Sequence, residues 1–323
     1  MPNRRTPLLL AAALLAFGAV ACAGRAARPV APAAPASADA GVLRFVVYGD
    51  TRFTDAAETE ASSPAARRAL VAQIAEERPA ALFIDGDLPW HGVDADYAQY
   101  REETGLWRER GIPVHPALGN HEFANCAEAD CLERWWRTFP ELRGRRWYAL
   151  DLGPRLAAII LDSTASLMPG AEQRAWLEAR IGALSAQTRF VLIVLHHPPV
   201  ADLQIGPAAS HNPRPNERAL AEYLEAAAAR SGAHFVVVAG HVHNYERFLR
   251  GGVTYLVSGG GGAHPYPVMR GADDLYQGSG FTNFHYLRFE LRGDALTGEM
   301  VRLDLPGGGA APLWEVRDRF SVP

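Results

Sequence analysis

The chain has 323 residues, a hydrophobic fraction of 48% and a formal net charge of −4. This length suits one large domain or two small ones, and the mildly acidic balance argues against a nucleic-acid groove, which needs a basic face. All 32 basic residues are arginines. Chemistry that depends on a P-loop lysine, a Schiff-base lysine or a Ser-Lys pair is therefore excluded.

The first 40 residues predict export. Arg4 and Arg5 precede an apolar run over residues 8–20, which is too short to span a bilayer comfortably and is typical of a signal peptide over residues 1–21. Small residues lead to Cys22, as in bacterial lipoprotein signals, where the cysteine is lipidated; an ordinary signal peptide with an incidental cysteine is the alternative. Residues 22–40 are rich in Ala and Pro and are typical of a tether. We expect a periplasmic or cell-surface protein that meets a bacterial membrane only through its lipid anchor.

From residue 41 onward, short apolar runs alternate with helical stretches. Helices are predicted over residues 64–77, 94–110, 170–184 and 216–230, the first of them capped by Ser63. Strands are predicted over residues 43–48, 80–84, 114–118, 190–195, 235–239 and 253–257. Residues 147–152 and 156–161 are predicted to pair as a hairpin, and residues 284–291 and 296–303 are further predicted strands.

This alternation predicts an α/β fold with a largely parallel or mixed sheet. No second linker interrupts the pattern, so one domain is expected over residues 41–305. Residues 306–323 are expected to form a C-terminal tail that packs back on the domain.

Two cysteines follow the predicted signal segment at close spacing. They are Cys126 and Cys131, in NCAEADC. An even pair in an exported protein predicts a disulfide that closes a small loop. A metal-binding pair is the alternative, but it would need further cysteines.

Five predicted strands end in polar residues that suit metal binding. Ligands of open α/β sheets bind beyond the carboxyl ends of the strands, so these side chains could converge in space. Carboxylate, amide and imidazole donors without a thiolate suit Zn, Fe or Mn. Each residue alone could be an ordinary turn or cap residue, and the joint pattern carries the prediction. The residues are Asp50, Asp87, Asn120, His121, His196, His241 and His243.

The motifs around these residues occur in a familiar order: GD at 49–50, GD at 86–87, GNHE at 119–122, HxP at 196–198 and GHxH at 240–243. They resemble the calcineurin-like metallophosphoesterases, and AGHVHNYERF at 239–248 is most similar to the purple acid phosphatase branch. The resemblance implies an α/β fold in which two mixed β-sheets pack as a sandwich flanked by helices. It also implies a two-metal site, with Fe, Zn or Mn, at the strand ends.

The resemblance implies a role for each residue. Asp87 would bridge the two metal ions. His121 would face the substrate and protonate the leaving oxygen or stabilise charge, and Glu122 would orient His121. The other ligands would be Asp50 and His243 at the first metal, and Asn120, His196 and His241 at the second.

The implied activity is hydrolysis of phosphate esters, above all of small phosphomonoesters. Two cations about 3.5–4 Å apart clamp the attacking and leaving oxygens, and a metal-bound hydroxide attacks phosphorus. One alternative is a phosphodiesterase acting on nucleotides or lipid head groups. The other is a phosphate-ligand binding protein whose first metal site is weakened.

Two positions depart from the family pattern at the first metal. Arg52 stands where many members have His, and Trp90 stands where purple acid phosphatases have a ligating Tyr. Neither side chain ligates a metal. Water could complete the site, the neighbouring His91 could reach in, or the first site could be weak.

Two further residues are candidates for substrate binding. The planar guanidinium of Arg52 could contact a substrate phosphate, or it could form a surface ion pair with Asp55 or Glu58. His211 lies in a long loop after the fourth motif and is a candidate pocket residue on that placement. His197 is expected to be a neighbour of the site and not a ligand.

Overall fold

The computed structural model describes residues 41–278, 283–306 and 310–323. The predicted signal peptide, the lipidated Cys22 and the tether lie outside the described residues. Within the described ranges, no helix has the length and apolar character needed to cross a membrane.

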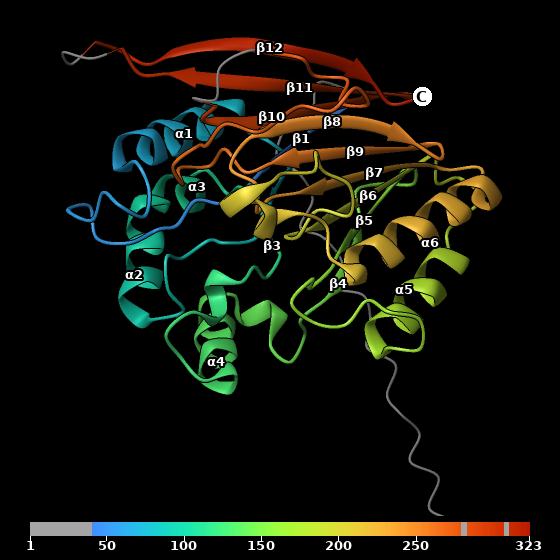
Figure 1. Ribbon diagram of the computed structural model, residues 1–323, viewed down its shortest axis with the longest axis horizontal. Helices are drawn as coiled ribbons and strands as arrows, with labels where there is room; N and C mark the ends of the chain where they lie inside the picture. The colour runs from blue at the N-terminus through green and yellow to red at the C-terminus, as the bar shows by residue number, and fades with distance from the viewer. Residues whose placement is uncertain (1–40, 279–282, 307–309) are drawn as a thin grey trace, which may run out of the picture. The chain divides into compact units, whose positions relative to one another are not determined.

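The described strands form two six-stranded mixed sheets, which confirms the predicted fold class (Figure 1). The first sheet has the order β12-β11-β10-β1-β2-β3 and the second has the order β4-β5-β6-β7-β9-β8. The strands of the first sheet are β1 (Val42–Tyr48), β2 (Ala81–Ile84), β3 (Val114–Pro116), β10 (His285–Arg292), β11 (Ala295–Asp304) and β12 (Leu313–Ser321). Those of the second are β4 (Tyr148–Asp151), β5 (Leu156–Ile160), β6 (Phe190–Leu195), β7 (His234–Ala239), β8 (Tyr245–Arg250) and β9 (Val253–Ser258).

Each sheet contains a block of parallel strands. In the first sheet β1, β2 and β3 run parallel, and in the second β5, β6, β7 and β9 do. The remaining pairs are antiparallel, among them the predicted hairpin of β4 and β5. The parallel blocks matter for function because the carboxyl ends of parallel strands lie along the same edge of a sheet.

Helices cover the outer faces of the two sheets. Figure 1 shows α1 to α3 together on one side, and α5 and α6 together on the other. The helices are α1 (Pro64–Glu77), α2 (Asp94–Glu103), α3 (Gly105–Glu109), α4 (Glu128–Thr138), α5 (Glu172–Gly182) and α6 (Pro215–Ser231). Short 3₁₀ turns are η1 (His121–Phe123), η2 (Pro140–Leu142) and η3 (Gly206–His211).

The middle strands of the second sheet are buried on both faces because their side chains alternate between two hydrophobic cores. Leu192 and Val236, which are partners in the register of β6 and β7, belong to the core shared with the first sheet. Ile193 and Val237, one position later, belong to the core that α5 and α6 cover. The period of two in a strand therefore explains why these strands read as continuous apolar runs.

The structure differs from the predicted elements in four places. The helix predicted over residues 94–110 is two helices, α2 and α3, which are separated at Thr104. Oγ1 of Thr104 donates a hydrogen bond to the carbonyl of Tyr100. The helix α4 and the strand β8, which carries three charged side chains, were not predicted. Residues 313–321, expected to be part of a tail, form β12, which pairs antiparallel with β11 at the edge of the first sheet.

Candidate metal centre

The carboxyl ends of the parallel strands from both sheets meet at one place. The backbone N–H of His241, after β7, donates a hydrogen bond of 2.8 Å to Oδ2 of Asp50, after β1. The N–H of His121, after β3, donates one of 2.9 Å to Oδ1 of Asp87, after β2. These bonds join loops that lie far apart in the sequence, so the convergence predicted from the strand ends is present in the fold.

The backbone at the site is held in an uncommon conformation. Asp50, Arg52, Asp87 and His241 have φ values of 55°, 48°, 51° and 70°. A positive φ is unfavourable for residues other than glycine and persists where surrounding structure holds it. Four strained residues around one point indicate that the loops are shaped for a functional site.

Two glycines let the carboxylates approach the neighbouring loops. A Cβ on Gly119 would lie 2.4 Å from both the backbone N and Oδ1 of Asp87. A Cβ on Gly240 would lie 2.3 Å from Oδ2 of Asp50. Only glycine fits at these positions, which gives the GNHE and GHVH motifs a steric reason for their first residue.

Four atoms proposed for the second metal gather around His196. Its Nε2 lies 3.1 Å from Oδ1 of Asn120, 3.2 Å from Oδ1 of Asp87 and 3.3 Å from Nδ1 of His241. Nδ1 of His196 lies 3.1 Å from the carbonyl oxygen of Asp85, which can only accept, so Nδ1 donates there and Nε2 is the nitrogen available as a ligand. Lone pairs that face one another at these distances repel unless a cation lies between them, so the donor set fits a metal ion.

The three atoms proposed for the first metal are also buried. Within the described part of the chain, Oδ1 of Asp50, Oδ2 of Asp87 and Nε2 of His243 are buried without a hydrogen-bond partner. Nε2 of His243 lies 3.4 Å from Oδ1 of Asp50, and its Nδ1 lies 3.0 Å from the carbonyl of His264. Burying such atoms unpaired is costly, and a cation would satisfy all three.

Among the described residues, two clusters of side chains lie close enough to hold a metal ion. The ligand atoms of Asp50, Asp87 and His196 all lie within 4.8 Å of one another. The ligand atoms of His196, His197 and His241 do so as well. His197, which the sequence suggested was only a neighbour, is thus close enough to join the second group, although its Nδ1 is engaged with Oγ of Ser163 at 2.9 Å.

The electrostatics favour the protonation states that metal ligands need. Burial alone would raise the pKa of Asp50, but the adjacent His243, His196 and Arg52 offset it and hold the pKa below its usual range. Burial, and then the neighbouring histidines, lower the pKa of His241 well below its ordinary value. An ionised carboxylate and a neutral imidazole are the forms that bind metal.

His121 faces the site without joining either ligand group. Its Nδ1 lies 2.7 Å from the carbonyl of Trp90, which leaves Nε2 directed inward, 3.7 Å from Oδ2 of Asp87. Burial lowers the pKa of His121, and the charge of Asp87 works against this shift. A donor or acceptor in this position could act on a substrate oxygen.

Glu122 has a different role from the one implied by resemblance. Its carboxylate accepts hydrogen bonds from the backbone N–H groups of Asp87, Leu88 and Gly119, at 3.1, 2.9 and 2.8 Å. Burial, and then the charge of Asp87, raise its pKa to about 8. Glu122 therefore positions Asp87 through the backbone, and the partner that orients the ring of His121 is the carbonyl of Trp90.

Arg52 lies inside the site. Nη2 is 3.5 Å from Oδ2 of Asp87, and Cζ is 5.0 Å from the ring centroid of Trp90. The side chain is 17% exposed, so the structure supports the site-facing alternative and not a surface pair with Asp55 or Glu58.

The remaining candidates divide between the site and its surroundings. The His211 ring lies 4.9 Å from that of His241 and 5.2 Å from that of Tyr266, at the border of the site. His91 turns elsewhere, because its Nδ1 lies 3.7 Å from Oδ2 of Asp96. His91 therefore does not complete the first metal site in this structure.

The sequence did not reveal Asp85 or Tyr266. Asp85 is fully buried, and both of its carboxylate oxygens lack a hydrogen-bond partner among the described residues. Burial, and then the charges of Asp50 and Asp87, raise its pKa well above the ordinary value. The Tyr266 hydroxyl donates a hydrogen bond of 3.2 Å to the carbonyl of His241, and no local pattern marks this residue.

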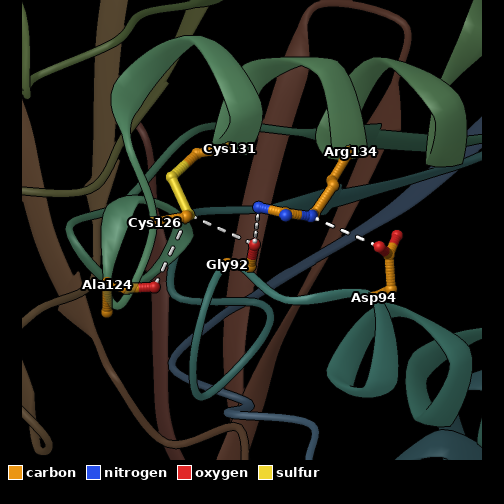
Figure 2. The surroundings of a disulfide bond; sticks show 6 residues. All are labelled: Gly92, Asp94, Ala124, Cys126, Cys131 and Arg134. Atoms are coloured by element: carbon orange, nitrogen blue, oxygen red, sulfur yellow. Dashed lines mark hydrogen bonds and ion pairs between the residues drawn. A yellow bond between two sulfur atoms is a disulfide. The ribbon is translucent and has the colours of Figure 1, made fainter.

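The predicted disulfide between Cys126 and Cys131 is present (Figure 2). Sγ of Cys126 lies 3.2 Å from the carbonyl oxygen of Gly92, and the N–H of Gly92 donates to the carbonyl of Ala124 at 2.9 Å. Arg134 also donates to the Gly92 carbonyl, as Figure 2 shows. The disulfide loop thereby braces the loop after β3, which carries His121, against the loop after β2, which carries Trp90.

Comparison with solved structures finds the same fold in several proteins, two of which are phosphatases by name. A purple acid phosphatase from yellow lupin (Lupinus luteus) seeds has a TM-score of 0.65 and 18% identity, over 81% of this chain and 51% of that chain. PhoD has a TM-score of 0.62 and 15% identity, over 91% and 73%. A dimetal phosphatase from Danio rerio has a TM-score of 0.56 and 17% identity, over 86% and 100%. The chain thus spans about half the length of the lupin enzyme.

Comparison with curated protein sequences found no match. The family model described as calcineurin-like phosphoesterase matches residues 43–245, more than half of the chain. This range contains every strand-end motif from Gly49-Asp50 to Gly240–His243. The chain therefore belongs to the calcineurin-like phosphoesterase family, a conclusion supported by the two mixed sheets and by side chains placed to hold divalent metal ions.

Proposed function

We propose that the protein hydrolyses phosphate esters, and phosphomonoesters in preference to other classes, at a centre of two metal ions. The observation that carries this proposal is the set of buried oxygen and nitrogen atoms, unpartnered or facing one another, at the converging strand ends. Family membership makes a phosphoester bond the target.

The two proposed metal sites share Asp87. Asp50 and His243 would complete the protein ligands of the first site, with water in the position that Trp90 cannot fill. Asn120, His196 and His241 would hold the second, with His197 within reach. Bound metal ions would supply positive charge and would make hydroxide available near neutral pH.

The chain's own residues would then bind the phosphoryl group and assist the leaving group. The guanidinium of Arg52 offers a planar pair of donors for two phosphoryl oxygens. Nε2 of His121 faces the same carboxylate oxygen as Arg52. In the doubly protonated ring, whose Nδ1–H donates to the Trp90 carbonyl, Nε2–H would give its proton to the leaving oxygen. His211 borders the other side of the site, next to His241.

These three side chains favour a monoester. A phosphomonoester presents three non-bridging oxygens and two negative charges, whereas a diester presents two such oxygens and one charge. Arg52, His121 and His211 add donors around the metal ligands, which suits the more highly charged group.

The test uses the purified full-length chain loaded with Mn, Zn or Fe, assayed on an aryl phosphate and on a bis-aryl phosphate. We expect faster cleavage of the monoester, and loss of activity in Asp87→Asn together with loss of bound metal measured by elemental analysis. Faster cleavage of the diester would instead favour the phosphodiesterase. One metal ion or none per chain, with phosphate binding and no cleavage of either ester, would favour a binding protein.

We also propose that the protein is exported and anchored through Cys22, so that its substrate lies outside the cytoplasm. The disulfide between Cys126 and Cys131 supports an oxidising compartment. In Cys22→Ala the protein should move from the membrane fraction to the soluble fraction after cell fractionation. Retention of this variant in the membrane fraction would contradict the anchor.

A further inference from the structure

We propose that Trp90 positions the two side chains that face the substrate, Arg52 and His121. At a position where it cannot ligate a metal ion, Trp90 would instead hold the side chains that contact the phosphoryl group. This inference rests on the proposed function. It assigns a positioning role to a residue that cannot bind metal and that neither the family pattern nor the ligand groups account for.

Trp90 contacts His121 in two ways. The indole and imidazole rings stack, with centroids 4.7 Å apart and planes inclined by 21°. The carbonyl oxygen of Trp90 lies 2.7 Å from Nδ1 of His121. The carbonyl accepts a hydrogen bond from Nδ1 and the stack fixes the tilt of the ring, so Nε2 is directed toward the site.

Trp90 also contacts Arg52. Cζ of Arg52 lies over the indole ring at 5.0 Å from its centroid, within the range of a cation–π interaction. Among the described residues, the carboxylate of Asp87 also lies against the guanidinium, at 3.5 Å. Nε of Arg52 is buried without a hydrogen-bond partner among the described residues, so few contacts hold this side chain.

The contact with the indole gains importance when metal is bound. Asp87 is the proposed bridging ligand, and metal ions would compete with Arg52 for its carboxylate. A nearby cation would also repel the guanidinium. The π face of Trp90 is uncharged and attracts a guanidinium, so it can retain Arg52 in the site where Asp87 no longer does.

The backbone of Trp90 is itself fixed to the neighbouring loops. Its N–H donates a hydrogen bond of 3.0 Å to the carbonyl of Phe53, the residue after Arg52. On its other side, Gly92 is packed so closely that a Cβ there would lie 2.1 Å from the carbonyl oxygen of Glu122 and 2.7 Å from Sγ of Cys126. Trp90 therefore links the loop after β1, which carries Arg52, to the loop after β3, which carries His121.

The experiment compares Trp90→Ala and Trp90→Phe in the full-length chain, with Trp314→Ala in β12 as a control for loss of a tryptophan outside the site. Each protein is loaded with the same metal and its metal content is measured. Steady-state kinetics are recorded on an aryl phosphate with a good leaving group and on an alkyl phosphate with a poor one. Binding of inorganic phosphate is measured separately by calorimetry.

For Trp90→Ala we expect unchanged metal content, phosphate binding weakened about 10-fold through the loss of Arg52 placement, and a kcat that falls about 10-fold more for the alkyl than for the aryl phosphate. The difference between leaving groups arises because only the poor leaving group needs full protonation by His121. Trp90→Phe keeps a π face and should stay within about threefold of the wild type on each measure.

Three results would overturn the proposal. Trp90→Ala could match the wild type on phosphate affinity and leaving-group dependence. Trp90→Ala and Trp90→Phe could lose bound metal and activity together, which would show that Trp90 has a structural role. Or kcat could fall equally for both esters.

The measurement of phosphate binding tests this inference separately from the proposed function. If the wild type cleaves neither ester, the proposed function fails. Weaker phosphate binding in Trp90→Ala, with Trp90→Phe unchanged, would still support the positioning of Arg52. Equal phosphate binding in all variants would overturn it.

Discussion

The N–H of His241 donates a hydrogen bond of 2.8 Å to Oδ2 of Asp50, and this bond joins the end of β7 in one sheet to the end of β1 in the other. Both residues have a positive φ. The other carboxylate oxygen of Asp50, Oδ1, is left buried and unpartnered within the described chain, 3.4 Å from Nε2 of His243. One carboxylate thus ties the two sheets together and presents a metal ligand.

Metal binding should stabilise the fold. Because buried ligand atoms lack partners without a cation, Mn or Zn at about 100 times its dissociation constant should raise the free energy of unfolding by about 2.7 kcal/mol. Calorimetric melting with added metal, and again with a chelator, measures this. Asp50→Asn should lose the metal-dependent increase, and Asp55→Asn, at an exposed position, should keep it. An unchanged melting temperature across metal concentrations would contradict a metal centre at Asp50.

His121→Asn should lower kcat by about 10²–10⁴-fold with metal content unchanged, because it removes the proposed proton donor without removing a ligand. Steady-state kinetics with elemental analysis measures both quantities. His234→Asn, at the opposite end of β7, is the matched control. Loss of metal in His121→Asn would show that this residue acts as a ligand.

Arg52→Ala should raise KM for a phosphomonoester by about 10–100-fold, since charge-assisted hydrogen bonds contribute about 1.5–3 kcal/mol. Arg52→Lys should recover only part of this loss, because an ammonium lacks the planar pair of donors and stacks less well on Trp90. Arg68→Ala, an exposed arginine of α1, serves as control. If Arg52→Lys equals the wild type, the planar geometry plays no part.

A buried acidic pair away from the metal ligands should make stability depend on pH. Burial raises the pKa of Glu246 to about 8 and that of Asp202 to about 6. The N–H of Asp202 donates to Oε2 of Glu246 at 2.7 Å, and the nearby charged groups are Asp274 and Arg270. Both carboxyls hold their protons more tightly in the folded state than in the unfolded state.

The free energy of unfolding contributed by this pair is therefore fully present below about pH 4 and falls as pH rises toward about 8. Glu246→Gln keeps an acceptor for the Asp202 N–H but cannot ionise. Denaturant unfolding at a series of pH values should show a flatter profile for Glu246→Gln than for the wild type between about pH 5 and 8. Parallel profiles would mean that Glu246 is ionised in the folded protein.

Removing the disulfide should affect both stability and catalysis. Closing so short a loop contributes about 2 kcal/mol in the chain-entropy account, so the double variant Cys126→Ser/Cys131→Ser should lose about that much free energy of unfolding. Because the disulfide loop packs on Gly92, kcat should fall as well, with metal content retained. Denaturant unfolding and kinetics under native conditions test this. Unchanged kcat would show that the disulfide does not affect the positions of Trp90 and His121.

The sequence alone was enough to predict the strands that lead to the site and the metal-binding type of the residues that follow them. Apolar runs that end in Asp, Asn or His are local signals, and alternation of strands with helices indicates which ends can meet. Ser63 caps α1 as predicted, with its Oγ 3.3 Å from the Ala66 nitrogen. The disulfide could be predicted for the same reason, because two cysteines lay close together in the chain.

Tertiary structure decided what each side chain contacts. β12 could not be predicted from its charged sequence, since it is an edge strand whose partner β11 supplies the backbone hydrogen bonds. Glu122 holds the backbone of Asp87, and Arg52, whose φ is 48°, places its guanidinium 3.5 Å from Oδ2 of Asp87. Trp90 stacks on His121 and Arg52 across three loops. Side-chain direction depends on packing between distant segments, and no local pattern records it.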